Sequence, residues 1–198
     1  MSGGGQRRQA GQRTREEGDG ERRPRRRQPL TRDEAWEYLL RVLARQSYTV
    51  AELRRKLAQR GVDDGTAEAL VVRLQDLRLV DDASYTEQYV ASRKSSRGRL
   101  ALGQELRRKG IDDTLALEHL GSLSPEQQLE AATALLHKNA WRYRPRSDEP
   151  RDPDEGEFEA LTRMHKARSK ALAFLARRGF SGDAAQAALT ASGWFDEE

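Results

Sequence analysis

The sequence contains no cysteine and no long apolar run, and each absence excludes a class of protein. Without cysteine there are neither disulfides nor thiolate metal ligands. No apolar stretch approaches the roughly 20 residues of a membrane-spanning helix. The N-terminal residues also lack the hydrophobic stretch of a secretory signal peptide. We therefore expect a cytoplasmic protein with no membrane association.

Apolar residues are scarce as well. They make up 36% of the 198 residues, and charged residues make up 34%, against about 45–50% and 25% in ordinary globular domains. One compact core for the whole chain is therefore not expected. Several small helical units that share apolar faces fit this composition better.

Positive charge is concentrated at the start of the chain. The net charge is +4, but residues 1–29 hold nine arginines and four acidic residues, so the remainder is close to neutral. After Met1 this leader has no aliphatic side chain larger than alanine, and we expect it to be disordered. It either binds phosphates through counterion release or is a solvated leader without a partner. Its densest arginines are Arg22, Arg23, Arg25, Arg26 and Arg27.

Three segments share one pattern around a glycine, at Gly61, Gly110 and Gly179. A leucine lies four residues before each glycine, a basic residue directly before it and a large apolar residue directly after it. An alanine follows at the sixth position and an aliphatic residue at the tenth. The matched residues are Leu57, Arg60, Val62, Ala67 and Val71, then Leu106, Lys109, Ile111, Ala116 and Leu120, then Leu175, Arg178, Phe180, Ala185 and Leu189. Five matched positions in three segments indicate an internal repeat.

Each copy is predicted to be a helix, a tight turn and a second helix. A basic residue favours the negative end of the helix dipole, and the glycine permits the left-handed backbone that ends a helix. Polar residues that can cap the second helix follow, namely Asp63, Asp64, Asp112, Asp113, Ser181 and Asp183.

One further helix is expected before each copy. Capping boxes are predicted at Thr31 with Glu34 and at Thr49 with Glu52, while Asp82 is expected to cap the helix of the middle copy. Ser124, Pro125 and Gln127 start another helix. The residues expected on the inner faces are Trp36, Leu39, Leu40, Leu43, Val90, Leu129, Ala132, Leu135 and Leu136. The pattern therefore predicts nine helices in three triplets.

These observations predict an all-α fold of three tandem three-helix repeats in an elongated curved stack. We place the repeats at 30–81, 82–122 and 123–192, with a C-terminal tail at 193–198. The spacing between repeat glycines rises from 49 to 69 residues in the third copy. A segment rich in proline and charge at about 144–157 accounts for the excess, and we expect it to be a flexible insertion.

The sequence offers few candidates for catalytic residues. His119, His137 and His165 are isolated, without a second ligand at a convincing metal-binding spacing. His119 aligns with Leu70 and Ala188, so we interpret it as a partly buried helix position. No phosphate-binding glycine motif is present. The sequence alone does not exclude a Ser/His/Asp catalytic triad, although no strained nucleophile turn is visible. The sequence favours a protein that binds macromolecules, with no cofactor or metal, over an enzyme.

The densest basic stretch outside the leader is 93–109, which contains one acid, Glu105. Such a helix–turn–helix can lie along a phosphate backbone or contact an acidic protein groove. The alternative is a solvated surface, with Tyr85 and Tyr89 in the core. We favour the core for the tyrosines and binding for the cations. The binding residues predicted here are Arg93, Lys94, Arg97, Arg99, Arg107, Arg108 and Lys109, with additional basic contacts from Arg54, Arg55, Lys56, Arg177 and Arg178.

Over about 33–190, leaving out the insertion, the chain resembles the RecX regulators of the RecA recombinase. The resemblance is carried by ELRRKLAQRGVDD at 52–64, LVDDASYTEQYVASRKSSRG at 79–98 and ELRRKGIDD at 105–113. The third copy, FLARRGFSGDAAQAAL at 174–189, is similar to the C-terminal repeat of that family. The most specific residues, in the order of the family, are Asp82, Tyr85, Tyr89, Arg93, Gly98, Leu106, Lys109 and Gly110.

The resemblance implies three three-helix repeats without known catalysis that bind RecA and insert into the groove of the RecA–DNA filament. It implies inhibition of the ATPase, strand-exchange and coprotease activities of RecA, and so a role in DNA repair and the SOS response. It also implies some affinity for DNA, and we expect little preference for sequence or strandedness. The long leader and the acidic, proline-rich insertion depart from the usual pattern. We expect a monomer.

A second hypothesis comes from a different class, a sequence-specific transcription regulator that uses the repeat as a helix–turn–helix. A recognition helix is expected to offer arginine, asparagine or glutamine near its N-terminus. The helices after Gly61 and Gly110 begin with aspartates, which phosphates repel. This favours filament binding.

Overall fold

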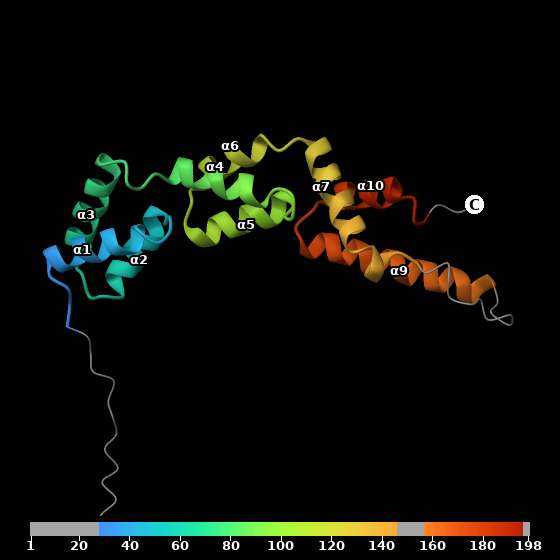
Figure 1. Ribbon diagram of the computed structural model, residues 1–198, viewed down its shortest axis with the longest axis horizontal. Coiled ribbons are helices and arrows are strands. Elements are labelled where there is room, and N and C mark those ends of the chain that lie inside the picture. The colour runs from blue at the N-terminus through green and yellow to red at the C-terminus, as the bar shows by residue number, and fades with distance from the viewer. Residues whose placement is uncertain (1–27, 146–156, 196–198) are drawn as a thin grey trace, which may run out of the picture.

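The computed structural model describes residues 28–145 and 157–195, and within these residues the chain is helical without a strand. The predicted all-α class is confirmed. Figure 1 shows an elongated, gently curved arrangement in which groups of helices follow one another in chain order. The helices are α1 (Arg32–Leu43), α2 (Val50–Ala58), α3 (Asp64–Asp76), α4 (Asp82–Arg93), α5 (Arg99–Lys109), α6 (Asp113–Gly121), α7 (Pro125–Lys138), α8 (Ala140–Tyr143), α9 (Glu157–Arg177) and α10 (Gly182–Ser192).

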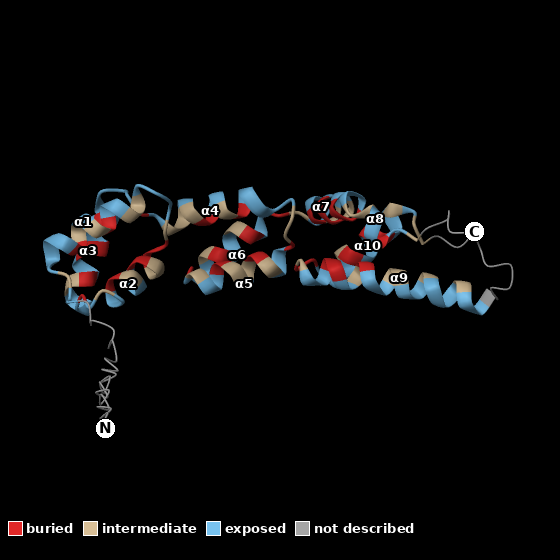
Figure 2. Cartoon of the chain, turned by 60° about the horizontal axis from the view of Figure 1, so that its bottom comes forward, coloured by how far each residue is buried: buried red, intermediate tan, exposed pale blue. Residues whose placement is uncertain are grey.

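The buried side chains form three separate clusters (Figure 2). The first lies among α1–α3, the second among α4–α6 and the third among α7–α10. We call these groups of helices the first, middle and third units. The third unit contains the short helix α8, which the sequence pattern did not predict, so the described residues form ten helices and not nine. Tyr143 of α8 stacks on Phe174 of α9 with 4.6 Å between ring centroids, and this packing explains the extra turn.

The repeat glycines end helices as predicted. Gly61, Gly110 and Gly179 have φ values of 74°, 82° and 81°. The amide of the apolar residue after each glycine donates back to the carbonyl of the repeat leucine, at 3.2 Å in the first unit, 3.1 Å in the middle unit and 3.2 Å in the third. Each of these apolar residues is buried. The glycines therefore form the expected left-handed turns.

Most predicted helix caps are confirmed. Complete capping boxes are present at the starts of α1, α2 and α7, and Asp63, Asp112 and Ser181 cap α3, α6 and α10. The prediction for Asp82 is wrong, since its neighbour Asp81 is the N-cap of α4. Leu40 is also not buried as expected, because it lies outside the inner face of α1.

The first two units meet where the C-terminal end of α5 contacts the N-terminal end of α2. The Thr49 hydroxyl donates to the Lys109 carbonyl at 2.7 Å. The Asp82 carboxylate accepts from the Val50 amide at 2.9 Å. A Cβ atom at Gly110 would overlap the Cβ of Ala51, so the two backbones approach closely. This junction explains why Asp82 does not cap its own helix.

The middle and third units meet in the same way. The C-terminal end of α9 contacts the N-terminal end of α5, where the Gly98 amide donates to the Arg178 carbonyl at 2.8 Å. The Leu100 amide donates to the Gly179 carbonyl at 3.0 Å. In the first unit the matching carbonyl, on Arg60, accepts from the Leu30 amide at 3.2 Å. The carbonyl before the repeat glycine thus accepts a hydrogen bond in all three units.

Several predictions lie outside the described residues. These are most of the leader, with Arg22, Arg23, Arg25, Arg26 and Arg27, most of the insertion at 144–157, and the end of the C-terminal tail. The repeat boundaries given above stay predictions. None of the described helices is long and apolar enough to cross a membrane.

Candidate functional site

The predicted basic residues at the end of α4 and in the turn after it surround one acid. Glu105 of α5 accepts a hydrogen bond from the Tyr89 hydroxyl at 2.8 Å. The same carboxylate lies 3.1 Å from Arg97 Nε and 4.0 Å from Arg93 Nε. The Arg93 guanidinium also lies over the Tyr89 ring, 4.1 Å from its centroid. Glu105 therefore holds the side chains of the two arginines in place, and its negative charge offsets part of their positive charge.

Tyr89 and Tyr85 support this cluster from α4. Both are partly buried against the core of the middle unit, as predicted, and their rings stack at 5.9 Å. Desolvation raises the pKa of Tyr89, and its hydrogen bond to Glu105 adds to the effect. Tyr89 consequently keeps its proton and remains a donor to Glu105.

Lys109 links the first and middle units. Its Nζ atom lies 2.9 Å from Oε1 of Glu52 on α2 and about 5.5 Å from the ring centroid of Tyr89. Burial acts to lower the pKa of Lys109, but hydrogen bonds to Tyr85 and Glu52 outweigh it and leave the pKa raised. Lys109 is thus an ion-paired residue at the junction of the first and middle units.

Arg99 lies at the junction of the middle and third units, at the N-terminal end of α5. Its backbone amide donates to Oε1 of the buried Gln128 on α7 at 2.8 Å. Its guanidinium donates to the carbonyl of Leu123. The structure therefore gives Arg99 a role in the packing of the two units.

Three predicted cations are left for a partner. Arg107 pairs with Asp113 at 2.9 Å, but both side chains are about two-thirds exposed, and such a pair contributes little to stability. Lys94 and Arg108 are exposed, and neither side chain has a hydrogen bond, ion pair or ring contact within residues 28–145 and 157–195. The exposed Arg93 and Arg99 differ from these three, because neighbouring groups of the protein hold their guanidinium groups.

The additional predicted basic residues also divide into those that contact neighbouring groups and those that are exposed. Arg54 forms a hydrogen-bonded pair with Glu68 at 2.8 Å, and Lys56 lies over the Tyr48 ring. Arg55 donates to the carbonyls of Arg108 and Lys109 at 3.4 and 3.5 Å, so it lies beside the C-terminal end of α5. In the third unit Arg178 lies over Phe174 and Arg177 is exposed on the last turn of α9.

The predicted residues therefore have different surroundings in the structure. Arg93, Arg97 and Lys109 gather around the tyrosines, whereas Arg99 and Arg107 line a depression between α5 and α6. Sequence reasoning noted Glu105 but missed the acid that pairs with Lys109, because Glu52 is 57 residues from it. No group of three or more potential metal ligands occurs in the described part of the chain.

A stack of small helical units with basic residues at its junctions defines a helical repeat protein. The family model described as the first three-helix domain of RecX matches residues 35–74, and the model of the second matches 81–120. These ranges coincide with the helices of the first and middle units.

Relatives and solved structures agree with these matches. The chain is 34% identical over 156 residues to Regulatory protein RecX of Mycobacterium sp. strain KMS, covering 78% of this chain and 79% of the relative. It is 35% identical over 168 residues to Regulatory protein RecX of Deinococcus radiodurans, covering 83% and 72%. The crystal structure of RecX from Lactobacillus salivarius aligns with a TM-score of 0.64 at 24% identity, covering 82% of this chain and 96% of that one. The chain belongs to the RecX family of regulatory proteins.

Proposed function

We propose that this protein binds the RecA–DNA filament and inhibits the ATPase, strand-exchange and coprotease activities of RecA. In this way it modulates DNA repair and the SOS response. The similarity to regulatory RecX proteins over most of both chains is the observation that carries the proposal. We propose that the protein acts as a cytoplasmic monomer with RecA as main partner, and with single- or double-stranded DNA as a second partner without sequence preference.

The contacts of the cations support two different roles for them. Lys109 and Arg99 contact neighbouring units, so they stabilise the arrangement of the units in the stack. Lys94, Arg107 and Arg108 are exposed on the middle unit, where they can contact phosphates or acidic side chains. Reversing the charge of Arg99 or Lys109 would disturb the junctions, and so it is a poor test of binding.

The first prediction is that Lys94→Gln, Arg107→Gln and Arg108→Gln, combined in one variant, weaken RecA inhibition. We expect the concentration for half-inhibition of the RecA ATPase on single-stranded DNA to rise by about tenfold or more. Each lost phosphate contact also reduces the slope of log affinity against log salt by roughly 0.7 for single strands. Binding to single-stranded DNA measured across a salt series should therefore show a shallower slope.

A matched control removes the same charge from another surface. Arg32, Arg41 and Arg45 are exposed on or just after α1, and their combined change to glutamine should leave both measurements close to wild type. Circular dichroism and urea unfolding check that both variants fold. Full inhibition by the folded middle-unit variant would contradict the assignment of this surface.

The transcription-regulator hypothesis is tested by footprinting. The helices after the repeat turns are capped by Asp63 and Asp112 and begin with Asp64 and Asp113, an acidic arrangement that does not favour insertion into DNA. Protection of one defined sequence by the protein alone would support the transcription regulator. Little sequence preference is expected of a filament modulator.

A further inference from the structure

Two depressions lie side by side on the surface where the middle and third units meet. The first, about 470 Å³, lies among the N-terminal ends of α5, α7 and α10. The second, about 460 Å³, lies between α5 and α6. Arg99 and Leu100 line both, so the two depressions have a common wall at the start of α5.

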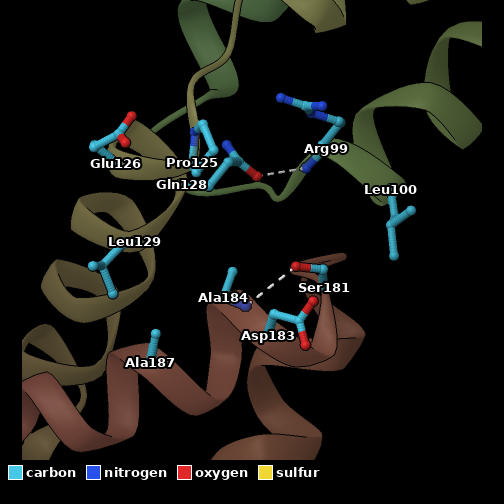
Figure 3. Close-up of a pocket in the computed structure, with 10 residues that line it drawn as sticks. All are labelled: Arg99, Leu100, Pro125, Glu126, Gln128, Leu129, Ser181, Asp183, Ala184 and Ala187. Carbon is cyan, nitrogen blue, oxygen red and sulfur yellow. Dashed lines mark hydrogen bonds between the residues drawn. The ribbon is translucent and has the colours of Figure 1, made fainter.

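The first depression has an apolar lining made by three helices. Leu100 of α5, Leu129 of α7 and Ala187 of α10 surround the same space (Figure 3). The rim carries two carboxylates, Glu126 and Asp183, in the first turns of α7 and α10. Arg99 also lines this depression, so its charged lining residues are two acids and one base. A partner side chain that enters this space would therefore be apolar, with a basic group beside the two carboxylates.

The second depression has apolar residues and the opposite charge. Leu117 and Leu120 of α6 line it together with Gly103, whose lack of a side chain keeps it open. Arg99 and Arg107 are its only charged lining residues among those the structure describes. A partner here would bring an apolar side chain with an acidic group beside it.

The leucines at this surface are unusually exposed. Leu100 is 58% exposed and Leu117 is 69% exposed, although both lie on well-formed helices of the middle unit. Large apolar side chains that line adjacent depressions are typical of docking sites for partner segments. The two depressions together offer two apolar subsites with opposite charge at their ends.

We propose that these depressions form one groove that receives an amphipathic helix of RecA. Two apolar side chains on one face of that helix would enter the depressions on either side of Leu100. The acidic end of that helix would lie at Arg107, its basic end at Glu126 and Asp183, and its middle at the common wall with Arg99. A helix with acidic residues first and basic residues last is also favoured by its own dipole. This inference rests on the proposed function and assigns a protein contact to it, in which Arg107 is the one exposed cation of the middle-unit variant that also lines the groove.

The experiment uses the full-length protein and fluorescein-labelled 20-residue peptides that tile the RecA sequence, with binding followed by fluorescence anisotropy. We expect binding of a peptide that has two apolar residues on one helical face, acidic residues before them and basic residues after them. The variant Leu100→Glu with Leu117→Glu should bind that peptide about tenfold or more weakly, because hot-spot apolar anchors contribute at least this much. Both side chains are largely exposed, so the variant should fold.

The control variant changes exposed apolar residues elsewhere. Val72 and Leu77 lie at the surface of the first unit, 44% and 53% exposed, and Val72→Glu with Leu77→Glu should bind the peptide like wild type. A peptide with its acidic and basic ends exchanged should bind wild type about tenfold more weakly. It should regain affinity for the variant Arg107→Glu with Asp183→Lys.

The RecA ATPase assay separates failure of this inference from failure of the proposed function. If wild type inhibits RecA, but no tile binds or the groove variant binds and inhibits like wild type, the groove assignment is wrong and the proposed function stands. If wild type neither binds nor inhibits RecA, the proposed function is wrong and the groove assignment is overturned with it.

Discussion

At the scale of single residues, Arg78 has a conformation that usually belongs to glycine. It follows α3 with a φ of 55° and is the one residue other than glycine with a positive φ in the described part of the chain. The Leu79 amide donates to the Leu74 carbonyl at 2.9 Å, the same bond that closes the three glycine turns. The first unit thus ends its last helix with a left-handed arginine, which has a steric cost.

We predict that Arg78→Gly stabilises the protein by about 0.5–1 kcal/mol, since glycine takes this conformation without a steric clash. Urea unfolding followed by circular dichroism measures the change. Arg78→Ala keeps the strained backbone and removes the same side chain, so it should give no comparable gain. Equal stabilisation by both changes would show that the gain comes from the loss of the arginine side chain.

Asp82 is a second residue with an unusual environment. Desolvation raises the pKa of its carboxyl group above the ordinary value, and the hydrogen bond from the Val50 amide offsets this only in part. Because the folded state then binds the proton more tightly than the unfolded state, the stability from Asp82 is complete at pH values below the unfolded pKa. It is lost as the pH rises through the folded pKa.

The corresponding prediction compares wild type with Asp82→Asn, which can still accept a hydrogen bond from Val50 but does not titrate. From about pH 3 to about pH 7, the free energy of unfolding of wild type should fall relative to the variant. Parallel urea titrations at several pH values measure this difference. A difference that stays constant with pH would mean that Asp82 has the same pKa in both states.

At the scale of elements, the close approach of α5 and α2 makes Gly110 a sensitive turn of the middle unit. Gly110→Ala should destabilise the protein by more than the roughly 1–2 kcal/mol that a left-handed residue costs, because the new methyl group also overlaps Ala51. Thermal unfolding of the full-length variant measures the loss.

Adding Ala51→Gly to Gly110→Ala provides the control. It removes the overlap but leaves the backbone strain, so the double variant should recover part of the loss beyond the cost of Ala51→Gly alone. Strict additivity of the two changes would contradict the direct contact between these helices.

The features that could be predicted from the sequence are those set by nearby residues. Helix ends depend on a glycine with the residues next to it, and capping boxes join residues three apart, so Gly61, Thr49 and Ser124 were all assigned correctly. The third unit was less predictable because α8 depends on the stacking of Tyr143 against α9. The left-handed Arg78 also has no sequence signature, since arginine is uncommon in that conformation.

The candidate site was predictable only in composition. A run of cations is visible in the sequence, but which of them stay accessible depends on acids that the fold brings close. Asp82 shows the same limit, because its local pattern is that of an N-cap while its carboxylate binds Val50 of the preceding unit. Long-range pairing of this kind cannot be read from spacing along the chain.

At the scale of the whole molecule, the boundary between leader and first unit matters. The leader was expected to end at residue 29, but Pro29 lies 3.2 Å from the position that a Cβ of Gly61 would occupy. Leu30 is partly buried against the first cluster. Residues 29 and 30 therefore belong to the folded part.

We predict that removing residues 1–27 leaves the melting temperature nearly unchanged and weakens binding to DNA, because the whole positive excess of the chain lies in this segment. Removing residues 1–30 should lower the melting temperature by several degrees in addition, since a loss of about 1 kcal/mol shifts it by roughly 2–4 °C in a chain of this size. Differential scanning calorimetry compares the two truncations. Equal melting temperatures would contradict the docking of Pro29 and Leu30.

The hydrogen bond from Leu30 to Arg60 also affects whether separate molecules of this protein can join end to end. Both junctions join unlike ends of neighbouring units, and such head-to-tail contacts have no intrinsic stopping point, so they can generate open-ended fibres between separate molecules. The Leu30 amide occupies the carbonyl of the first unit that a further unit would otherwise use. This short segment therefore blocks the addition of another unit at one end of the stack. A chain that lacks it is expected to form concentration-dependent oligomers in sedimentation velocity experiments.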